Sequence, residues 1–79
     1  MPQKKPRFIV TFHTTAEAMA TEKVCRQNRL GGRLIPAPRI LSADCGIAWS
    51  APPELREATE QAIRQAGIEV AGFHEMALP

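Results

Sequence analysis

The chain has 79 residues, with ten Lys and Arg against eight Asp and Glu, which gives a formal net charge of +2. A chain this short forms one domain with a small core, so we expect neither a second domain nor a multi-step catalytic apparatus. The net charge is too small to predict nucleic-acid binding, and no stretch approaches the roughly 20 apolar residues of a membrane span.

The charge is unevenly distributed along the chain. Residues 1–39 contain eight basic and two acidic side chains, whereas residues 40–79 contain two basic and six acidic ones. One face would therefore be basic if the two halves do not interleave in space. Two cysteines, Cys25 and Cys45, are too few for the disulfide framework of a small secreted module, so we expect a cytoplasmic protein with reduced thiols.

The N-terminal part predicts a lead-in and a strand. Residues 1–6 are polar and contain prolines, so we expect a flexible lead-in followed by a single domain over residues 7–79. Residues 7–13 are rich in Phe, Ile, Val and Thr, which is typical of a strand. Their alternation places three side chains on one face: Phe8, Val10 and Phe12.

A helix is predicted next. Thr14 followed by Glu17 is a capping-box pattern, in which the two side chains accept hydrogen bonds from backbone N–H groups at the helix start. The pair Gly31-Gly32 would end the helix. The apolar stripe of this helix is predicted to contain Ala16, Met19, Ala20, Val24 and Leu30. Cys25 lies on the opposite side of the helix from this stripe, so we expect it to be an incidental surface thiol.

Residues 33–39 predict an extended segment whose prolines indicate its place in a sheet. Pro36 and Pro38 lack backbone N–H groups at positions two apart, which point to the same side of a strand. Both prolines can therefore face away from a neighbouring strand, which predicts an edge strand. Arg33 and Arg39 would make this edge basic.

The rest of the chain predicts a loop, a strand, a helix and a last strand. Residues 40–44 are expected as the loop and residues 45–51 as a short, central strand. Pro52-Pro53 sets up a helix start, Gly67 ends that helix, and residues 68–76 form the last strand. The stripe of this second helix is predicted to contain Leu55, Ala58, Thr59, Ala62, Ile63 and Ala66.

The resulting order of elements is βαββαβ, with an edge-type second strand. This order predicts an α+β ferredoxin-like sandwich, in which a four-stranded antiparallel sheet carries both helices on one face. A looser α/β unit without a true fourth strand is the alternative. The fold hosts enzymes, metal carriers, RNA binders and regulatory domains, so it does not name a function.

The stretch RLIPAPRILSADCGIAW, residues 33–49, contains an LIPxPR run, a loop with Ser42, the pair Cys45-Gly46 and an apolar strand. A helix that begins at Thr14-Thr15 and contains Glu22-Lys23 precedes it. These features resemble the selenium/sulfur (Se/S) carrier protein-like family of small bacterial and archaeal proteins, over about residues 8–73. The resemblance implies that Cys45 holds sulfur or selenium as a persulfide or selenopersulfide for transfer to a partner protein. We expect no cofactor.

The role implied for Cys45 requires a thiolate that two partners can reach in turn. Gly46 would allow close backbone approach, and Arg39, at the other end of the loop, would stabilise the thiolate and neutralise a bound anion. Asp44 would oppose this unless it pairs with a base. The remaining predicted binding residues are Arg33, Pro36, Pro38, Ser42 and Lys23. Lys23 would either place its charge beside the loop or lay the aliphatic part of its side chain along the edge of the apolar stripe of the first helix.

Other interpretations remain open. If Cys45 is a small packing residue of a central strand, the basic edge strand becomes the docking surface of a non-catalytic interaction module. RNA binding would need aromatic residues on the central strands, where the third strand offers Trp49. No acid, base and nucleophile converge as in a stand-alone enzyme, and His13, His74 and the cysteines lack metal-ligand spacing. We expect sulfur or selenium donors and acceptors as partners, no nucleic acid or membrane, and a monomer or weak homodimer.

Overall fold

The computed structural model describes residues 5–41 and 45–78, which form four strands and two helices. The strands are β1 (Lys5–Thr11), β2 (Arg33–Pro36), β3 (Ile47–Ala51) and β4 (Gly72–Leu78). The helices are α1 (Thr15–Gln27) and α2 (Arg56–Gln65), and a single turn of 3-10 helix, η1 (Pro53–Leu55), leads into α2. Within this part of the chain, no helix is both long enough and apolar enough to span a membrane.

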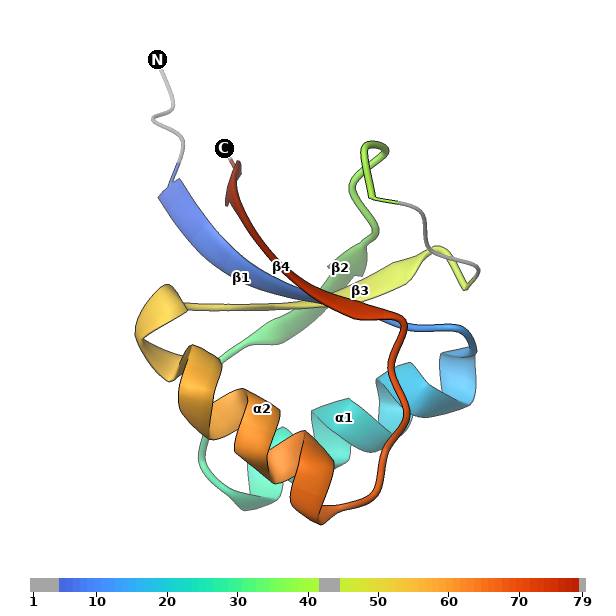
Figure 1. Cartoon of the computed structure of the whole chain (residues 1–79), viewed down its shortest axis with the longest axis vertical. Coiled ribbons are helices and arrows are strands. Elements are labelled where there is room, and N and C mark those ends of the chain that lie inside the picture. Colours follow the sequence, from blue (N-terminus) through green and yellow to red (C-terminus); the bar gives the residue numbers. More distant parts are fainter. Residues whose placement is uncertain (1–4, 42–44, 79) are drawn as a thin grey trace.

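One antiparallel sheet contains all four strands in the order β2-β3-β1-β4. Both helices lie on the same side of this sheet (Figure 1). This is the ferredoxin-like α+β sandwich that the sequence predicts, with β2 at an edge and β3 in the centre. Because β4 pairs with β1 along its whole length, the alternative without a true fourth strand is wrong.

The core lies between the sheet and the helices. Phe8 and Val10 of β1 stand opposite Ala51 and Trp49 of β3, so the four side chains share the helix-facing side of the sheet. The ring of Phe8 also stacks on Phe73 of β4, with ring centroids 5.7 Å apart. The buried core cluster confirms the predicted face of β1 and comprises Phe8, Val10, Phe12, Ala18, Cys25, Trp49, Ala51 and Ile63.

The start of α1 is capped by side chains, as predicted. The Thr14 hydroxyl accepts a hydrogen bond from the Glu17 backbone N–H at 3.2 Å. The Glu17 carboxylate in turn accepts from the backbone N–H of His13 at 2.7 Å, one residue before the cap. Two backbone donors at the helix start are thus satisfied, and the negative charge lies where the helix dipole favours it.

The predicted buried face of α1 is wrong. The residues that α1 buries are Ala18, Thr21 and Cys25, whereas Ala16 is exposed and Met19 is 53% exposed. The helix contains several small residues, so more than one stripe fits the helical spacing. The sheet presents large rings to α1, and the stripe with the smaller side chains packs against them.

The end of α1 also differs from the prediction. The helix stops at Gln27, before the two glycines, and Arg29 adopts the left-handed conformation with a φ of 56°. The backbone N–H of Leu30 then donates to the carbonyl of Cys25 at 2.8 Å, as in a Schellman motif. Leu30 therefore follows the helix and packs beside the core as part of a loop.

Each strand has at least one boundary that differs from the predicted one, and two of the shifts change which residues belong to the sheet or to a loop beside the core. Strand β1 begins at Lys5, which pairs with Leu78, so two residues assigned to the lead-in belong to the sheet. Strand β4 begins only at Gly72, after a segment in which Ile68 and Val70 pack against the core without strand pairing. The predicted stop of α2 is confirmed, since Gly67 follows the helix with a φ of 70°.

Candidate functional site

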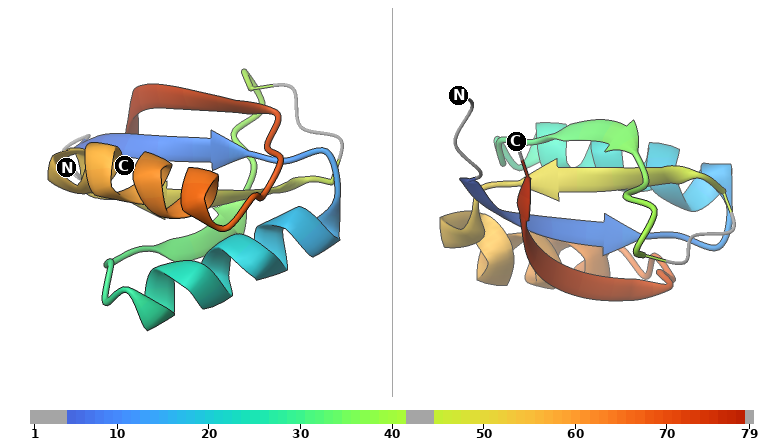
Figure 2. Two further views of the ribbon diagram at one scale, coloured as in Figure 1. Left: turned by 60° about the horizontal axis from the view of Figure 1, so that its bottom comes forward. Right: turned by 90° about the horizontal axis from the view of Figure 1, so that it is seen from above.

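The connection from β2 to β3 forms a loop whose base is closed by backbone pairing. Pro36, the last residue of β2, lies opposite Ile47, the first residue of β3. One step beyond, the backbone N–H of Ala37 donates to the carbonyl of Gly46 at 2.9 Å. Cys45 therefore lies at the base of the loop, directly before the closing hydrogen bond. In the right-hand view of Figure 2, residues 37–41 cross the sheet on the side away from the helices.

The thiol of Cys45 has an apolar side and an open side. The side chain is half-buried, packs against the margin of the core, and donates a hydrogen bond from Sγ to the carbonyl oxygen of Ile47 at 3.3 Å. Gly46 has a φ of 73°, which favours glycine, and, apart from its two chain neighbours, no described residue has a heavy atom within 4 Å of where its Cβ would stand. Among the described residues, the side of Gly46 that this Cβ would occupy is open to an approaching reactant.

The environment of Cys25 is the opposite, and the expectation of a surface thiol there is wrong. Cys25 is 0% exposed and belongs to the core cluster beneath α1. Burial raises the pKa of the Cys25 thiol to about 11, so this thiol stays protonated at neutral pH. Both cysteines are free thiols, and Cys45 is the one that solvent reaches.

Arg39 and Ile40 occupy the tip of a turn in the described part of the loop. The backbone N–H of Leu41 donates to the carbonyl of Pro38 at 2.9 Å, which places the two residues between them at the tip. Arg39 is exposed, and within residues 5–41 and 45–78 its side chain forms no ion pair. Ile40 is 79% exposed and was not predicted as a binding residue, although an aliphatic side chain in a loop, next to an arginine, is a signal for one.

The loop groups five of the predicted site residues. Pro36, Pro38, Arg39, Cys45 and Gly46 all belong to the β2–β3 connection or to its base. The predictions for Ser42 and Asp44 fall outside the described residues.

Two other predicted binding residues lie elsewhere. Arg33 stands at the far end of the β2–β3 ladder, opposite Ser50 and three pairs away from the Pro36–Ile47 pair at the loop base. Lys23 is exposed on α1, so its side chain is not part of the buried face of that helix.

Each of the two histidines contacts one side chain of the described residues. His13 Nδ1 lies 3.4 Å from the Glu17 carboxylate at the start of α1. His74 Nε2 lies 3.3 Å from the hydroxyl oxygen of Thr11 across the β1–β4 pair. Within the part of the chain that the structure describes, no three His, Cys, Asp or Glu side chains gather as they would around a metal ion.

Comparison with protein families matches residues 7–75 to the family described as "Putative Se/S carrier protein-like". The chain belongs to this family. The match runs from β1 into β4 and includes both cysteines. Comparisons with curated proteins and with solved structures found no match.

In this Se/S carrier-like protein, the described parts of the motif are residues 34–41 and 45–46. They include most of β2 and the hydrogen bond between Ala37 and Gly46 that closes the loop base. The most specific part of the motif therefore surrounds Cys45, rather than Cys25 or the helices.

Proposed function

We propose that this protein carries a sulfur or selenium atom on Cys45 and delivers it to a partner protein in the cytoplasm. The contrast between the two thiols carries the proposal. Cys25 is enclosed by the core and protonated, whereas Cys45 is half-buried at a loop base, next to a glycine whose outer side is left open by the described residues other than its chain neighbours. A carrier thiol must be reached first by a donor and then by an acceptor, and Cys45 meets that requirement. Membership of the Se/S carrier-like family supports the same assignment.

Loading is a transfer of sulfur without net oxidation. The Cys45 thiol first loses its proton to solvent, and the thiolate attacks the outer sulfur of a persulfide donor. The S–S bond of the donor breaks, the donor leaves as a thiolate, and a new S–S bond forms on Cys45. Delivery repeats the step, because a nucleophile of the acceptor attacks the outer sulfur and Cys45 leaves as a thiolate. Selenium transfer follows the same balance through a selenopersulfide.

The hydrogen bond from Cys45 to Ile47 distinguishes the resting thiol from the reactive form. A thiol donates to the carbonyl oxygen of Ile47 at 3.3 Å, but a thiolate has no hydrogen to donate. The negatively charged sulfur is then repelled by that oxygen. We expect the deprotonated side chain to turn from Ile47 toward the open space beside Gly46, where a donor can reach it.

The turn at the loop tip supplies groups for the partners. Arg39 presents a positive charge to solvent on the same loop as Cys45, which attracts donors that carry negative charge away from the reacting sulfur, such as the carboxylates of glutathione persulfide. Ile40, 79% exposed, offers an apolar contact to a partner protein. In this proposal, Arg39 acts on the approach of the donor and Ile40 on docking.

The test is the intact mass of the protein after incubation with a small-molecule persulfide such as glutathione persulfide. The parent and the matched control Cys25→Ala should each gain one sulfur atom that peptide mapping places on residue 45, and Cys45→Ser should gain none. Denaturant unfolding checks that both variants fold. Equal uptake by Cys45→Ser and the parent, or no uptake by the parent, would contradict the proposal.

An interaction module is the second candidate function, and the exposure of Ile40 favours it. Ile40 is 79% exposed and lies beside Arg39. An aliphatic and an arginine side chain together can form a small docking surface without any role for Cys45. In that case Cys45 is a packing residue, and replacing it by Ser costs no more than about 1 kcal/mol of stability, because the hydroxyl can also donate to the carbonyl of Ile47. The same mass measurement separates the two functions, since a docking module gains no sulfur on residue 45.

A further inference from the structure

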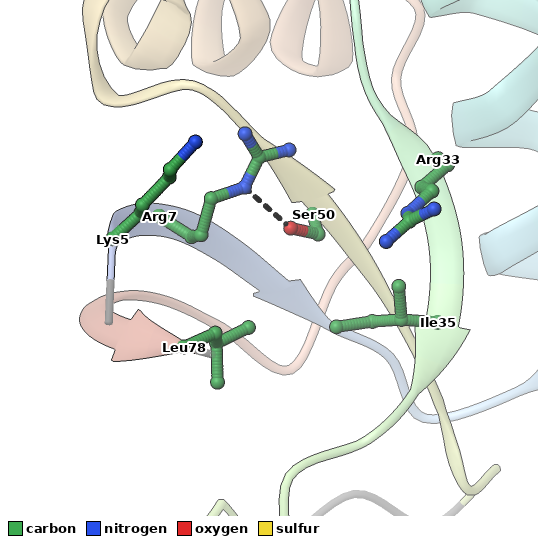
Figure 3. A pocket seen from close by; sticks show the side chains of 6 residues that line it. All are labelled: Lys5, Arg7, Arg33, Ile35, Ser50 and Leu78. Atoms are coloured by element: carbon green, nitrogen blue, oxygen red, sulfur yellow. Dashed lines mark hydrogen bonds between the residues drawn. The ribbon is translucent and has the colours of Figure 1, made fainter. Parts of the chain in front are cut away.

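A hollow of about 270 Å³ opens on the face of the sheet away from the helices (Figure 3). All four strands contribute to it, and three of its side chains are basic. The lining residues are Lys5 and Arg7 of β1, Arg33 and Ile35 of β2, Ser50 of β3 and Leu78 of β4.

The strand register brings these residues to one face. Ser50 stands opposite Arg33 on one side and Ile9 on the other, and Arg7, two residues before Ile9, shares that face. Lys5 pairs with Leu78 at the end of the β1–β4 ladder. Residues directly opposite one another, or two apart in a strand, point to the same side of a sheet, so the six side chains share one face and line the same hollow.

The Ser50 hydroxyl accepts a hydrogen bond and has a hydrogen left to donate. Arg7 Nε donates to Ser50 Oγ at 2.9 Å, and Ser50 is only 3% exposed. Because this oxygen accepts from Arg7, its own hydrogen is available, and no described residue accepts it. The two terminal nitrogens of Arg7 are likewise left for a ligand. In Figure 3, Arg7 and Arg33 flank Ser50, while Ile35 and Leu78 point toward each other below them.

The positive charge of the hollow is not compensated by the described residues. Lys5, Arg7 and Arg33 form no ion pair within residues 5–41 and 45–78. Glu75 of β4 stands opposite Phe8, on the helix-facing side, where its carboxylate lies 3.3 Å from Arg56. Strands β3 and β4 belong to the acidic half of the chain and alternate in the sheet with β1 and β2 of the basic half. The side chains that β3 and β4 supply to the hollow, Ser50 and Leu78, are nevertheless uncharged.

We propose that the hollow binds a phosphate group, either as inorganic phosphate or as part of a small phosphate monoester. A phosphate monoester has close to two negative charges and three acceptor oxygens at neutral pH, which matches three cations and a serine hydroxyl. A single carboxylate has one charge and two oxygens, so it would leave some of the three basic side chains and the serine hydroxyl without a partner. Ile35 and Leu78 provide an apolar floor on which the organic part of a monoester would rest.

The hollow is separate from the site at Cys45. Ser50 lies near the opposite end of β3 from the loop base, and Cys45 packs against the core on the helix side. Phosphate binding here therefore stands or fails independently of the proposed carrier function.

The test is a titration followed by the backbone amide signals of the protein in NMR, at constant ionic strength with chloride as the compensating ion. Inorganic phosphate should produce saturable shifts centred on Arg7, Arg33 and Ser50. Arg33→Gln should weaken the affinity about tenfold, because it removes one charge-assisted contact. The matched control Arg64→Gln, which makes the same change on exposed α2, should leave the affinity within about twofold of the parent.

Two further probes distinguish the possible ligands. Glycerol phosphate should shift Ile35 and Leu78 as well and bind more tightly than inorganic phosphate if the natural ligand is a monoester; equal affinity indicates free phosphate. A glutamate-rich peptide tests for a protein partner. The proposal is overturned if neither phosphate probe saturates, if Arg64→Gln weakens binding as much as Arg33→Gln, or if the peptide alone produces the saturable shifts.

Discussion

The indole ring of Trp49 lies directly against the backbone of Gly32. A Cβ atom at Gly32 would stand 2.6 Å from Cζ2 of Trp49 and 2.8 Å from the carbonyl oxygen of Ser50. Gly32 also has a φ of 152°, which residues with a side chain rarely adopt. Arg33, the next residue, begins β2, so this contact helps to set where the edge strand meets β3.

Gly32→Ala should therefore destabilise the protein by more than backbone strain alone. Gly67 is a matched control, because its φ of 70° also favours glycine but, apart from its two chain neighbours, no described residue has an atom within 4 Å of its added Cβ. We expect Gly67→Ala to cost about 1–2 kcal/mol, from the left-handed backbone, and Gly32→Ala to cost about 1–3 kcal/mol more, from overpacking. Denaturant unfolding measures the loss of stability in each variant. Equal losses would show that the Trp49 side chain can move to make room for the added Cβ.

Stability should fall at alkaline pH because of Cys25. The native state holds the thiol proton up to about pH 11, whereas the unfolded chain releases it near the free-thiol value of about 8.5. The unfolded state thus binds fewer protons between these values, so the free energy of unfolding decreases as the pH rises through them. The loss is at most about 3 kcal/mol.

Denaturant unfolding between neutral pH and pH 11 measures this loss. A Cys45→Ser background removes the second thiol, and the chain contains no Tyr, so lysines are the main other side chains that titrate in this range. Cys25→Ala in the same background should lack the thiol-dependent part of the decrease. If the free energy of unfolding of that variant decreases with pH as steeply as that of its background, the decrease belongs to the lysines instead.

Alkylation should distinguish the two thiols in the folded protein. At neutral pH, a thiol with a pKa of about 11 has a thiolate fraction about two to three orders of magnitude below that of an ordinary thiol, and the core shields Cys25 as well. Iodoacetamide should therefore modify Cys45 first and Cys25 only after denaturant is added. Mass mapping over time measures both rates, and similar rates in the native protein would contradict the carrier assignment.

Arg39→Gln should slow the loading of Cys45 by an anionic persulfide. Arg39 is exposed on the loop, so its charge acts mainly on the encounter, and we expect a decrease of about threefold to tenfold at low ionic strength. Added salt should remove most of the difference. Arg64→Gln, with the same change of net charge on α2, should have little effect; equal slowing by both variants would leave Arg39 without a specific role.

Replacing the prolines of the edge strand should promote self-association. The backbone N–H of Ala37 faces β3, where it donates to Gly46, so the neighbouring Pro36 faces outward. Valine at 36 and 38 would restore donors on the free side of β2 and permit pairing with a second sheet. Sedimentation should show dimers or larger species for the double variant, with Pro36→Val contributing more because it lies within β2. A monomer at high concentration would contradict this prediction.

Local sequence patterns were sufficient for the fold and for the loop that carries Cys45. The cap at Thr14 and Glu17, the stop at Gly67 and the alternation in β1 each act through neighbours a few residues away, so each could be predicted. Pro36 and Pro38 placed β2 at an edge because proline lacks an N–H, whatever the rest of the chain does. The motif around Cys45 is likewise continuous in sequence.

Tertiary structure decided which faces and which distant residues meet. The small residues of α1 permit more than one buried stripe, and only packing against the rings of the sheet selects the stripe with Cys25 and exposes Met19. Arg7 and Ser50, 43 residues apart, meet because the strand order places β3 beside β1. No local pattern marks either as a binding residue, since a hollow between strands depends on the pairing register and this register is set by long-range contacts.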